Sequence, residues 1–433
     1  MRFFVKSIKV NTFLRGILIF MLLTAMEWLL PAATAMIPHQ KLQKHMEESA
    51  SYYMKQPVFY RIHTSDPAST IDHYADSILL NILYYFDEDA PFSSVLSDSY
   101  YYTDTHNENE NLMTAVMTNE APTYDYSRYW HGSAIILRPL LLIASVSDIY
   151  LLLAVILGIL TIFTILSLYR HVHPASAPAF GIAMILVSFW YIPMSFEYIW
   201  CFLLMFIFLL YLIHRYPTGR MHTCLFFFVI GNITAYFDFL TTETLTLLMP
   251  LAVLLLLINR DHPLSDKKEG LHILFIHTLL WGAGYLSSWL AKWSLASVVL
   301  HQNVFVSAFS DASVRLSGST SELSGISLRF SAVAKNMSCL FPFNLISRHG
   351  YILVLICLIT IGIFYYLFKK EKQNNCLSCL FLLLFFLPYA RYLVLANHSY
   401  LHAFFTYRAQ FASVFLLIMI LISGLNWSRR KKH

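Results

Sequence analysis

Long apolar runs recur along the whole chain, and short turns with polar or charged residues separate most of them. A typical run has about 20 residues, the length that a helix needs to cross a hydrocarbon core of roughly 30 Å. Because that core offers no water to pair with backbone groups, segments of this kind cross it as helices. The pattern predicts an all-α integral membrane protein with about ten transmembrane helices. The expected spans are Phe13–Met36, Asp148–Tyr169, Pro178–Ile192, Ser195–Ile213, Met221–Phe237, Thr242–Ile258, Leu271–Ala291, Tyr351–Phe368, Leu377–Leu395 and Tyr407–Leu425.

The positions of Lys and Arg orient these spans. If the N-terminus is cytoplasmic, the basic clusters beside the spans fall on the cytoplasmic side, as the positive-inside rule expects. The C-terminus is then cytoplasmic too. The first run ends in Ala33-Thr34-Ala35, which resembles a signal-peptidase site, but its apolar length exceeds a typical signal core, so we expect an uncleaved anchor. The clusters are Arg170, Arg215, Arg220, Arg260, Lys267, Lys268, Lys369, Lys370, Lys372 and the Arg429–Lys432 tail.

Two long polar stretches are expected on the outer side. In the first, His39 to Met54 and Thr70 to Phe86 have helical patterns, whereas Ser97 to Pro122 is expected to be irregular. Gly132 to Val146 is short for a span and contains Arg138, so we expect an amphipathic surface helix or a shallow re-entrant one. The expected organisation is 1–36, tail and first transmembrane helix; 37–147, outer loop; 148–291, transmembrane bundle; 292–349, second outer loop; and 350–433, C-terminal helices and basic tail.

Composition supports a membrane protein and excludes an ordinary soluble domain. The chain is 57% hydrophobic and 13% charged, whereas soluble domains carry roughly 25% charge. The excess of basic residues lies beside apolar runs and is a topology signal, so no nucleic-acid partner is expected. The cysteines lie almost entirely in or beside apolar runs and predict no disulfide framework. Cys376 and Cys379 form a lone CxxC, a weak indication of metal binding.

The segment Ile71 to Asp76 holds the first candidate chemistry. Asp72 and Asp76 are four residues apart, so they share a helix face, where like charges disfavour the helix. A carboxylate held near the membrane surface could act as general base on an acceptor hydroxyl. The alternative is a solvated helix face on which Asp72 caps the helix N-terminus.

The turn before the last span holds the second candidate, in which His398 and His402 share a helix face and Arg408 follows. A guanidinium with donor histidines at headgroup depth suits a phosphate. The histidines could instead bind a metal, although no third ligand is apparent, or the group could anchor the turn among lipid headgroups.

Further candidates are aromatic and acidic. Arg128 and His131 lie in a Tyr- and Trp-rich segment, Tyr124 to Gly132, that could stack on sugar rings and reach an anion or could form an interfacial aromatic belt. Asp238 and Glu243 lie at an outer turn and could reach the same cavity as Asp72 or simply be exposed. Ionisable groups inside spans are expensive and suggest function by default. Glu27 and Glu197 are the acids of this kind.

Taken together, these features resemble the GT-C superfamily of membrane glycosyltransferases, which use polyprenyl-phosphate-linked sugars. The matching parts are the first span, the Asp72-His73-Tyr74-Ala75-Asp76 helix and the surface helix after Trp130. The Tyr-Ala-acid step is similar to the acidic motif of the protein mannosyltransferase and aminoarabinose transferase branch, although the motif lacks that branch's adjacent Asp-Glu pair. The segments around Arg128, Asp238 and His398 also resemble uncharacterised multi-pass membrane proteins of Gram-positive bacteria.

The resemblance implies a bacterial cell-membrane enzyme that moves a sugar from a polyprenyl-phosphate carrier to an envelope polymer or lipid on the extracytoplasmic side. Asp72 or Asp76 would be the general base, and no cofactor or metal is required. The residues expected to bind substrate are Arg128, His131, Asp238, Glu243, His398, His402 and Arg408.

Two other classes of function fit the sequence. A transporter or lipid flippase would use acids along one path through the membrane, namely Glu27, Glu197 and Asp238. A non-catalytic envelope assembly protein would use the outer loop as a contact surface and would tolerate loss of any single carboxylate.

Overall fold

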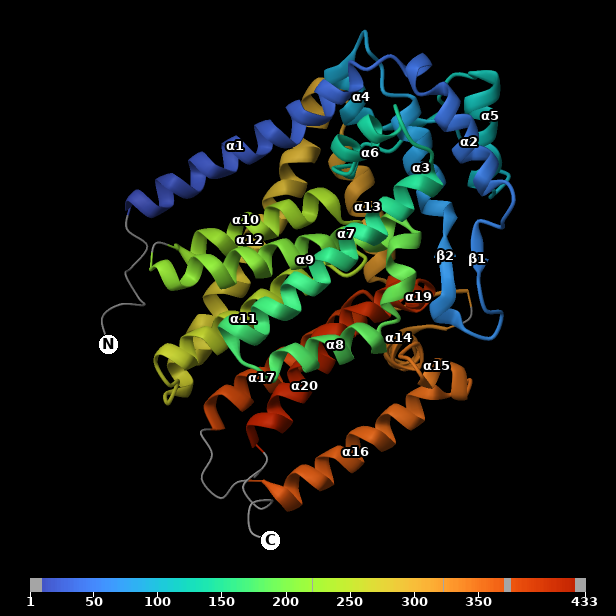
Figure 1. The fold of residues 1–433 in the computed structure, drawn as a ribbon. Coiled ribbons are helices and arrows are strands. Elements are labelled where there is room, and N and C mark those ends of the chain that lie inside the picture. The colour runs from blue at the N-terminus through green and yellow to red at the C-terminus, as the bar shows by residue number, and fades with distance from the viewer. Residues whose placement is uncertain (1–9, 220, 322, 370–374, 425–433) are drawn as a thin grey trace.

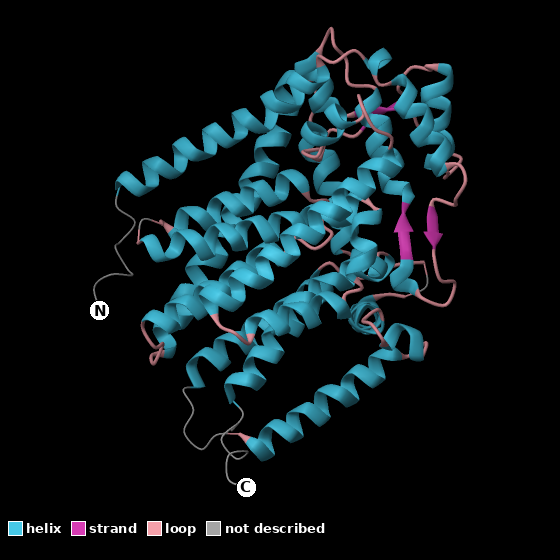
Figure 2. Ribbon diagram, viewed as in Figure 1, coloured by secondary structure: helices cyan, strands magenta, loops and turns pink. Residues whose placement is uncertain are grey.

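Helices form most of the described chain. The computed structural model describes residues 10–219, 221–321, 323–369 and 375–424. Figure 2 shows strands only as two short antiparallel pairs in this part of the chain: β1 (Phe59–Arg61) with β2 (Thr70–Asp72), and β3 (Ser99–Tyr100) with β4 (Tyr124–Asp125). The all-α prediction is confirmed at this level.

Each of the predicted apolar runs contains a helix. These helices are α1 (Val10–Ala35), α7 (Val146–Ser167), α8 (Ser176–Leu186), α9 (Phe196–Arg215), α10 (Thr223–Phe237), α11 (Leu245–Asp261), α12 (Lys267–Val299), α16 (Gly350–Phe368), α17 (Asn375–Val394) and α20 (Gln410–Gly424).

Among the described residues, seven helices have the length and apolarity to cross a membrane. They lie in Leu14–Ala35, Val146–Val172, Phe196–Thr218, Lys267–Val299, Gly350–Phe368, Cys376–Val394 and Ala403–Gly424. The apolar helices α8 and α10 are shorter. In α11 every side chain from Leu245 to Ile258 is buried, so its apolar surface faces other helices of the bundle.

The remaining elements lie between these helices. They are α2 (Gln43–Tyr53), α3 (His73–Tyr84), α4 (Pro91–Ser97), α5 (Glu108–Thr118), α6 (Ala134–Leu140), α13 (Val304–Leu316), α14 (Gly325–Ser338), α15 (Phe343–Ile346), α18 (Ala396–Leu401), α19 (Ala403–Thr406) and the short helical turns at His39–Lys41, Pro67–Ser69, Leu168–Val172, Phe189–Met194, Tyr216–Thr218 and Tyr407–Ala409.

The long helices form a bundle, and the segment from α2 to α6 gathers at one end of it (Figure 1). The start of α1 and the end of α20 lie toward the other end (Figure 1). The basic residues Arg220, Lys370 and Lys372 and the 429–432 tail, which the topology prediction used, lie outside the described residues.

Backbone contact between α10 and α12 stabilises the bundle. A Cβ atom on Gly231 would lie 2.0 Å from the carbonyl oxygen of Trp281, and one on Gly284 would lie 1.9 Å from that of Phe228. Only residues without a side chain permit this approach, which is how small residues pack membrane helices closely. The two glycines therefore determine the spacing of the central helices.

Two local predictions are wrong or incomplete. The helix predicted from Thr70 begins at His73, because residues 70–72 form β2 and Asp72 is the N-cap of α3. Residues 97–122 are not wholly irregular, since α5 lies within them. In the second polar stretch, for which no secondary structure was predicted, α12 extends past residue 292 to Val299, and α13, α14 and α15 follow.

The segment with Arg138 is expected to form an amphipathic surface helix or a shallow re-entrant one. It forms only the seven-residue α6, and Arg138 is fully buried. Its guanidinium donates to the backbone oxygens of Thr34, Ile37, Leu83 and Phe86. A buried cation is stable only with such partners, so this arginine joins the end of α1 to the end of α3.

Candidate functional site

A cavity of about 400 Å³ lies where α3, the start of α9, α13 and α18 meet. Its charged and titratable lining comes from segments far apart in the sequence, which are brought together only by the fold. Those side chains are Asp72, Tyr74, Asp76, Tyr126, Tyr129, His131, Glu197, Arg315, His398 and His402. The predicted candidates Asp72, Asp76, His131, His398 and His402 therefore share one cavity.

Asp72 has a local structural role that occupies only one of its two carboxylate oxygens. Its Oδ1 accepts a hydrogen bond of 2.9 Å from the backbone N–H of Ala75, which caps α3. The Asp72 carboxyl also hydrogen-bonds the side chain of Glu197, the second residue of α9. Burial raises the pKa of Asp72 to about 6, against hydrogen bonds that lower it. Two carboxyls in such contact share a proton, so the pair can both accept and release one.

Asp76 is bound on most sides. It accepts hydrogen bonds from the hydroxyls of Tyr150 and Ser195 and from the backbone N–H groups of Phe196 and Glu197. A carboxylate at the positive N-terminus of a twenty-residue helix is stabilised there. Burial raises the pKa of Asp76 to about 7, and these hydrogen bonds oppose that rise. Because its oxygens are already engaged, Asp76 anchors α3 to α9, whereas the Asp72 carboxyl contacts Glu197 at the cavity wall.

Arg315, near the C-terminus of α13, supplies the positive charge of the cavity. Its Nη1 lies 3.0 Å from Nδ1 of His398, and Nη2 lies 3.7 Å from a carboxylate oxygen of Asp311. The guanidinium also lies over the ring of Tyr129, 5.6 Å from its centroid. Nε is buried and has no partner among the described residues. A buried donor without a partner is costly, and an anion in the cavity would satisfy it.

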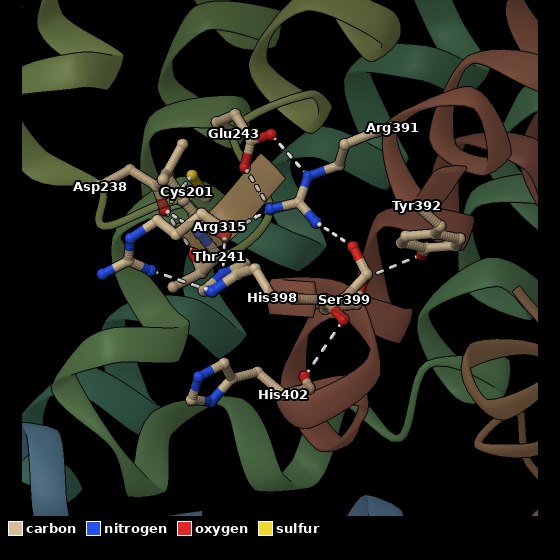
Figure 3. Close-up of polar contacts among 12 residues, drawn as sticks. Cys201, Asp238, Thr241, Glu243, Arg315, Arg391, Tyr392, His398, Ser399 and His402 are labelled. Carbon is tan, nitrogen blue, oxygen red and sulfur yellow. Dashed lines mark hydrogen bonds and ion pairs between the residues drawn. The ribbon is translucent and has the colours of Figure 1, made fainter. Parts of the chain in front are cut away.

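His398 fixes the position of Arg315 (Figure 3). Its Nε2 lies 2.9 Å from the carbonyl oxygen of Leu240 and so must carry the hydrogen, which leaves Nδ1 to accept from Arg315. Burial and the neighbouring His402 and Arg315 lower the pKa of His398 well below its usual value. The ring is therefore neutral at pH 7, and its Nδ1 accepts a hydrogen bond from the guanidinium of Arg315. The sequence analysis expected this histidine to donate a hydrogen bond to a phosphate instead.

His402 lies beside this pair. Its ring centroid is 4.8 Å from that of His398, and it stacks on Phe405. Burial lowers the pKa of His402 to about 4, with Arg315 adding to the effect. The described residues contain no group of three or more His, Cys, Asp or Glu side chains that could hold a metal.

Asp238 and Glu243 lie behind the cavity and not in its lining. The two oxygens of Glu243 accept from Arg391 at 2.6 and 3.0 Å, and Asp238 accepts from Thr241 and from Cys201 (Figure 3). These contacts stabilise the turn between α10 and α11.

The same turn contains a strained residue. Leu240 has φ of +64°, a left-handed conformation that is rare for a bulky residue. It directs the Leu240 carbonyl to both His398 and Arg391. The buried ion pair of Arg391 therefore supports Arg315 indirectly, through Leu240 and His398.

Arg408 is also outside the cavity lining. It is buried, lies over the rings of Tyr198 and Tyr407 and donates to the carbonyl oxygens of Phe404 and Ala68. These contacts with backbone and rings give it a packing role. The guanidinium that faces the cavity is that of Arg315, which the sequence analysis did not single out.

A second, smaller cavity adjoins the first. It has about 210 Å³, and Tyr129 and Arg315 line both. Arg128 lies here, hydrogen-bonded to Asp311 at 2.9 Å and placed over the Tyr126 ring. The rest of the lining is mostly apolar and includes Leu240, Tyr285, Leu286, Trp289, Trp293, Leu316 and Leu395.

His131 completes the first cavity. Its Nδ1 lies 3.1 Å from a carboxylate oxygen of Asp98, and Nζ of Lys292 lies 2.7 Å from the same oxygen. All three side chains are buried, so the Asp98 carboxylate is compensated by one or two cations. This group holds His131 in a fixed orientation at the cavity wall.

The fold and this site define a class: a multi-helix protein with apolar helices of membrane-spanning length and a polar cavity at one end of the bundle. No family model, curated protein or solved structure matches the chain.

Proposed function

We propose that this protein is a multi-pass bacterial membrane glycosyltransferase of GT-C type that moves a sugar from a polyprenyl-phosphate carrier to a cell-envelope acceptor. In this proposal both termini are cytoplasmic, all of the predicted apolar runs span the membrane, and the cavity opens on the extracytoplasmic side. The observation that carries the proposal is the placing of Asp72 and Arg315 in one cavity while Arg315 also lines an apolar one.

The two cavities match the parts of a lipid-linked sugar donor. The apolar cavity suits the first isoprene units, Arg315 at the junction suits the phosphate, and the larger cavity suits the sugar and the acceptor hydroxyl. The rings of Tyr74, Tyr126 and Tyr129 give the sugar apolar faces and hydroxyl partners. An anion at Arg315 would use the Nε donor that has no partner among the described residues.

In the proposed reaction Asp72 takes the proton of the acceptor hydroxyl as its oxygen attacks the anomeric carbon. The bond from that carbon to the phosphate oxygen breaks, and the lipid phosphate leaves with the electron pair. Arg315 stabilises the negative charge that grows on the leaving group. Attack opposite the leaving group inverts the configuration at the anomeric carbon.

The transporter alternative has less support. Of its three acids only Glu197 lines the cavity, whereas Glu27 hydrogen-bonds Ser288 and Asp238 bonds the turn at Thr241. Among the described residues, Glu27, Glu197 and Asp238 therefore do not line one common cavity through which a substrate could pass.

The test compares the envelope glycans of a strain that lacks the gene with those of the same strain carrying a plasmid copy. The copy encodes the wild-type protein, Asp72→Asn, Asp76→Asn or Asp104→Asn. The Asp104 side chain is 85% exposed and serves as the matched control. We expect a specific glycan to be missing in the deletion and Asp72→Asn strains and present with Asp104→Asn. Because Asp76 anchors α9, Asp76→Asn is expected to lower the amount of protein. Unchanged glycans in the deletion strain would refute the proposal.

Arg315 gives a second test in purified protein. Loss of its charge-assisted hydrogen bonds to a phosphate should cost about 1.5–3 kcal/mol, so Arg315→Gln should lower kcat/KM for the lipid-linked donor by about 10- to 100-fold. His398→Phe, which removes the acceptor that fixes Arg315, should show a smaller loss in the same direction. Equal kcat/KM for wild type and Arg315→Gln would exclude phosphate binding there.

A further inference from the structure

A third and larger cavity opens beside the candidate active site. It has about 1070 Å³ and lies between the β1–β2 hairpin, α14, the start of α16 and the α18–α19 turn. Phe59 and His402 line both this groove and the 400 Å³ cavity, so the two spaces are neighbours. We call it the basic groove, because its lining holds Arg61, Lys335 and Arg348 and no Asp or Glu.

The β1–β2 hairpin connects the groove to the catalytic residue. In its register Phe59 lies opposite Asp72 and Arg61 lies opposite Thr70. Asp72 lines the active-site cavity, whereas Arg61 and Thr70 line the groove. Two residues along a strand cover about 7 Å, so Arg61 and Thr70 in the groove lie about that far along the hairpin from Phe59 and Asp72.

The basic residues of the groove lie on a side of the protein where membrane proteins have few Lys and Arg residues. In the proposed topology this is the extracytoplasmic side, on which Lys and Arg are depleted near spans. Arg61 and Arg348 are exposed, and Arg348 lies two residues before α16. Lys335 donates to the carbonyl oxygen of Tyr400 and lies over its ring, which holds the ammonium at the groove wall.

The rest of the lining suits a polymer of sugars or polyols. Hydroxyls come from Thr70, Ser331, Ser338 and Tyr400, and aromatic faces come from Phe330 and Phe404. The groove volume is more than twice that of the active-site cavity, 1070 against 400 Å³, so it suits several units of a chain better than one small molecule.

Resting on the proposed glycosyltransferase function, we infer that the basic groove binds the acceptor and that the acceptor is an anionic polymer, with hydroxyl groups and phosphate groups along its chain. Arg61, Lys335 and Arg348 bind the phosphates, and the hydroxyl to be glycosylated lies past Phe59 at Asp72. The groove thus selects anionic acceptors over neutral ones.

The test measures binding, which needs no catalysis. Full-length protein in phosphatidylcholine nanodiscs is titrated at low salt with fluorescent phosphorylated maltohexaose and with neutral maltohexaose. The variant Arg61→Gln/Arg348→Gln is compared with Lys44→Gln/Lys55→Gln, which removes two exposed cations that line none of these cavities.

We expect the phosphorylated probe to bind more tightly than the neutral one and the groove variant to weaken its binding about tenfold, since it removes two exposed cations. The control variant should bind like wild type. Equal binding of both probes to wild type, or equal losses in the two double variants, would overturn the inference.

A lipid source of the phosphate is tested separately. If the groove variant loses bound phosphatidylglycerol in native mass spectrometry but binds the phosphorylated probe like wild type, the groove holds headgroups and the inference is wrong. The Asp72→Asn protein should bind the probe normally. If cells that carry Asp72→Asn keep the glycan, the transferase proposal is refuted, and the binding result is unaffected.

Discussion

The pH dependence of sugar transfer gives the sharpest test of Asp72 as the base. Burial raises the pKa of this carboxyl from 3.8 to about 6. A general base acts only when deprotonated, so its active form is lost as the pH falls through the raised pKa. We therefore expect kcat/KM to have an acid limb with a midpoint near pH 6.

The size of the effect follows from the titration. With a pKa of about 6, about nine-tenths of Asp72 is deprotonated at pH 7 and about one-tenth at pH 5. The rate should therefore fall about tenfold between these values. A carboxyl with the ordinary value of 3.8 would lose less than about a tenth of its active form over the same range.

The assay measures initial rates of transfer by purified protein in proteoliposomes, with the donor identified from the glycan missing in the deletion strain. Glu197→Gln keeps a side-chain donor for Asp72, so its acid limb should stay near pH 6. Glu197→Leu removes the hydrogen bond that lowers the pKa of Asp72, so its midpoint should move to higher pH. An acid limb near pH 4 in wild type, or identical limbs in the two variants, would show that Asp72 is not the titrating base.

Two further predictions concern stability, measured as the unfolding temperature in detergent. Arg391→Met leaves the buried Glu243 unpaired and should destabilise the protein by about 3–5 kcal/mol. The double variant Arg391→Met/Glu243→Gln should recover much of that loss. Equal unfolding temperatures for the single and double variants would contradict this prediction. Gly284→Ala places a Cβ 1.9 Å from the Phe228 oxygen and should cost about 1–3 kcal/mol, while Gly282→Ala, with nothing within 4 Å of its Cβ, should be neutral or stabilising. A destabilised Gly282→Ala variant would show that the cost is not steric.

Apolar periodicity predicted the helices well because a membrane leaves little choice. Every predicted apolar run contains a helix, including Pro178–Ile192, where the helix is short. Segments outside the runs were predicted less well. At Thr70 the pattern suits a helix, but pairing with β1 makes residues 70–72 a strand. Such pairing depends on a partner strand, which local pattern does not reveal.

The candidate site was predicted only in part. Asp72, Asp76, His131, His398 and His402 do meet in one cavity. The separate roles of the two aspartates depend on the start of α9, 120 residues further along the chain, so sequence spacing could not assign them.

Arg315 was missed because its neighbours are Ser-rich and resemble a loop. A local signal existed: Asp311 and Arg315 form an acid and base pair at i and i+4, which favours a helix there. Arg408 was chosen instead for its place beside the two histidines, and its burial between aromatic rings is a tertiary effect.

The order of the site residues along the chain has a consequence for biogenesis. The acids Asp72 and Glu197 are synthesised early, Arg315 follows, and His398, which holds Arg315 in place, comes from the last hairpin of helices. A ribosome-bound chain that lacks this hairpin therefore carries the proposed proton acceptor, Asp72, without the histidine that holds Arg315. The cavity is complete only when this last part of the chain is in place, so on the proposed function a chain truncated before α18 would lack activity.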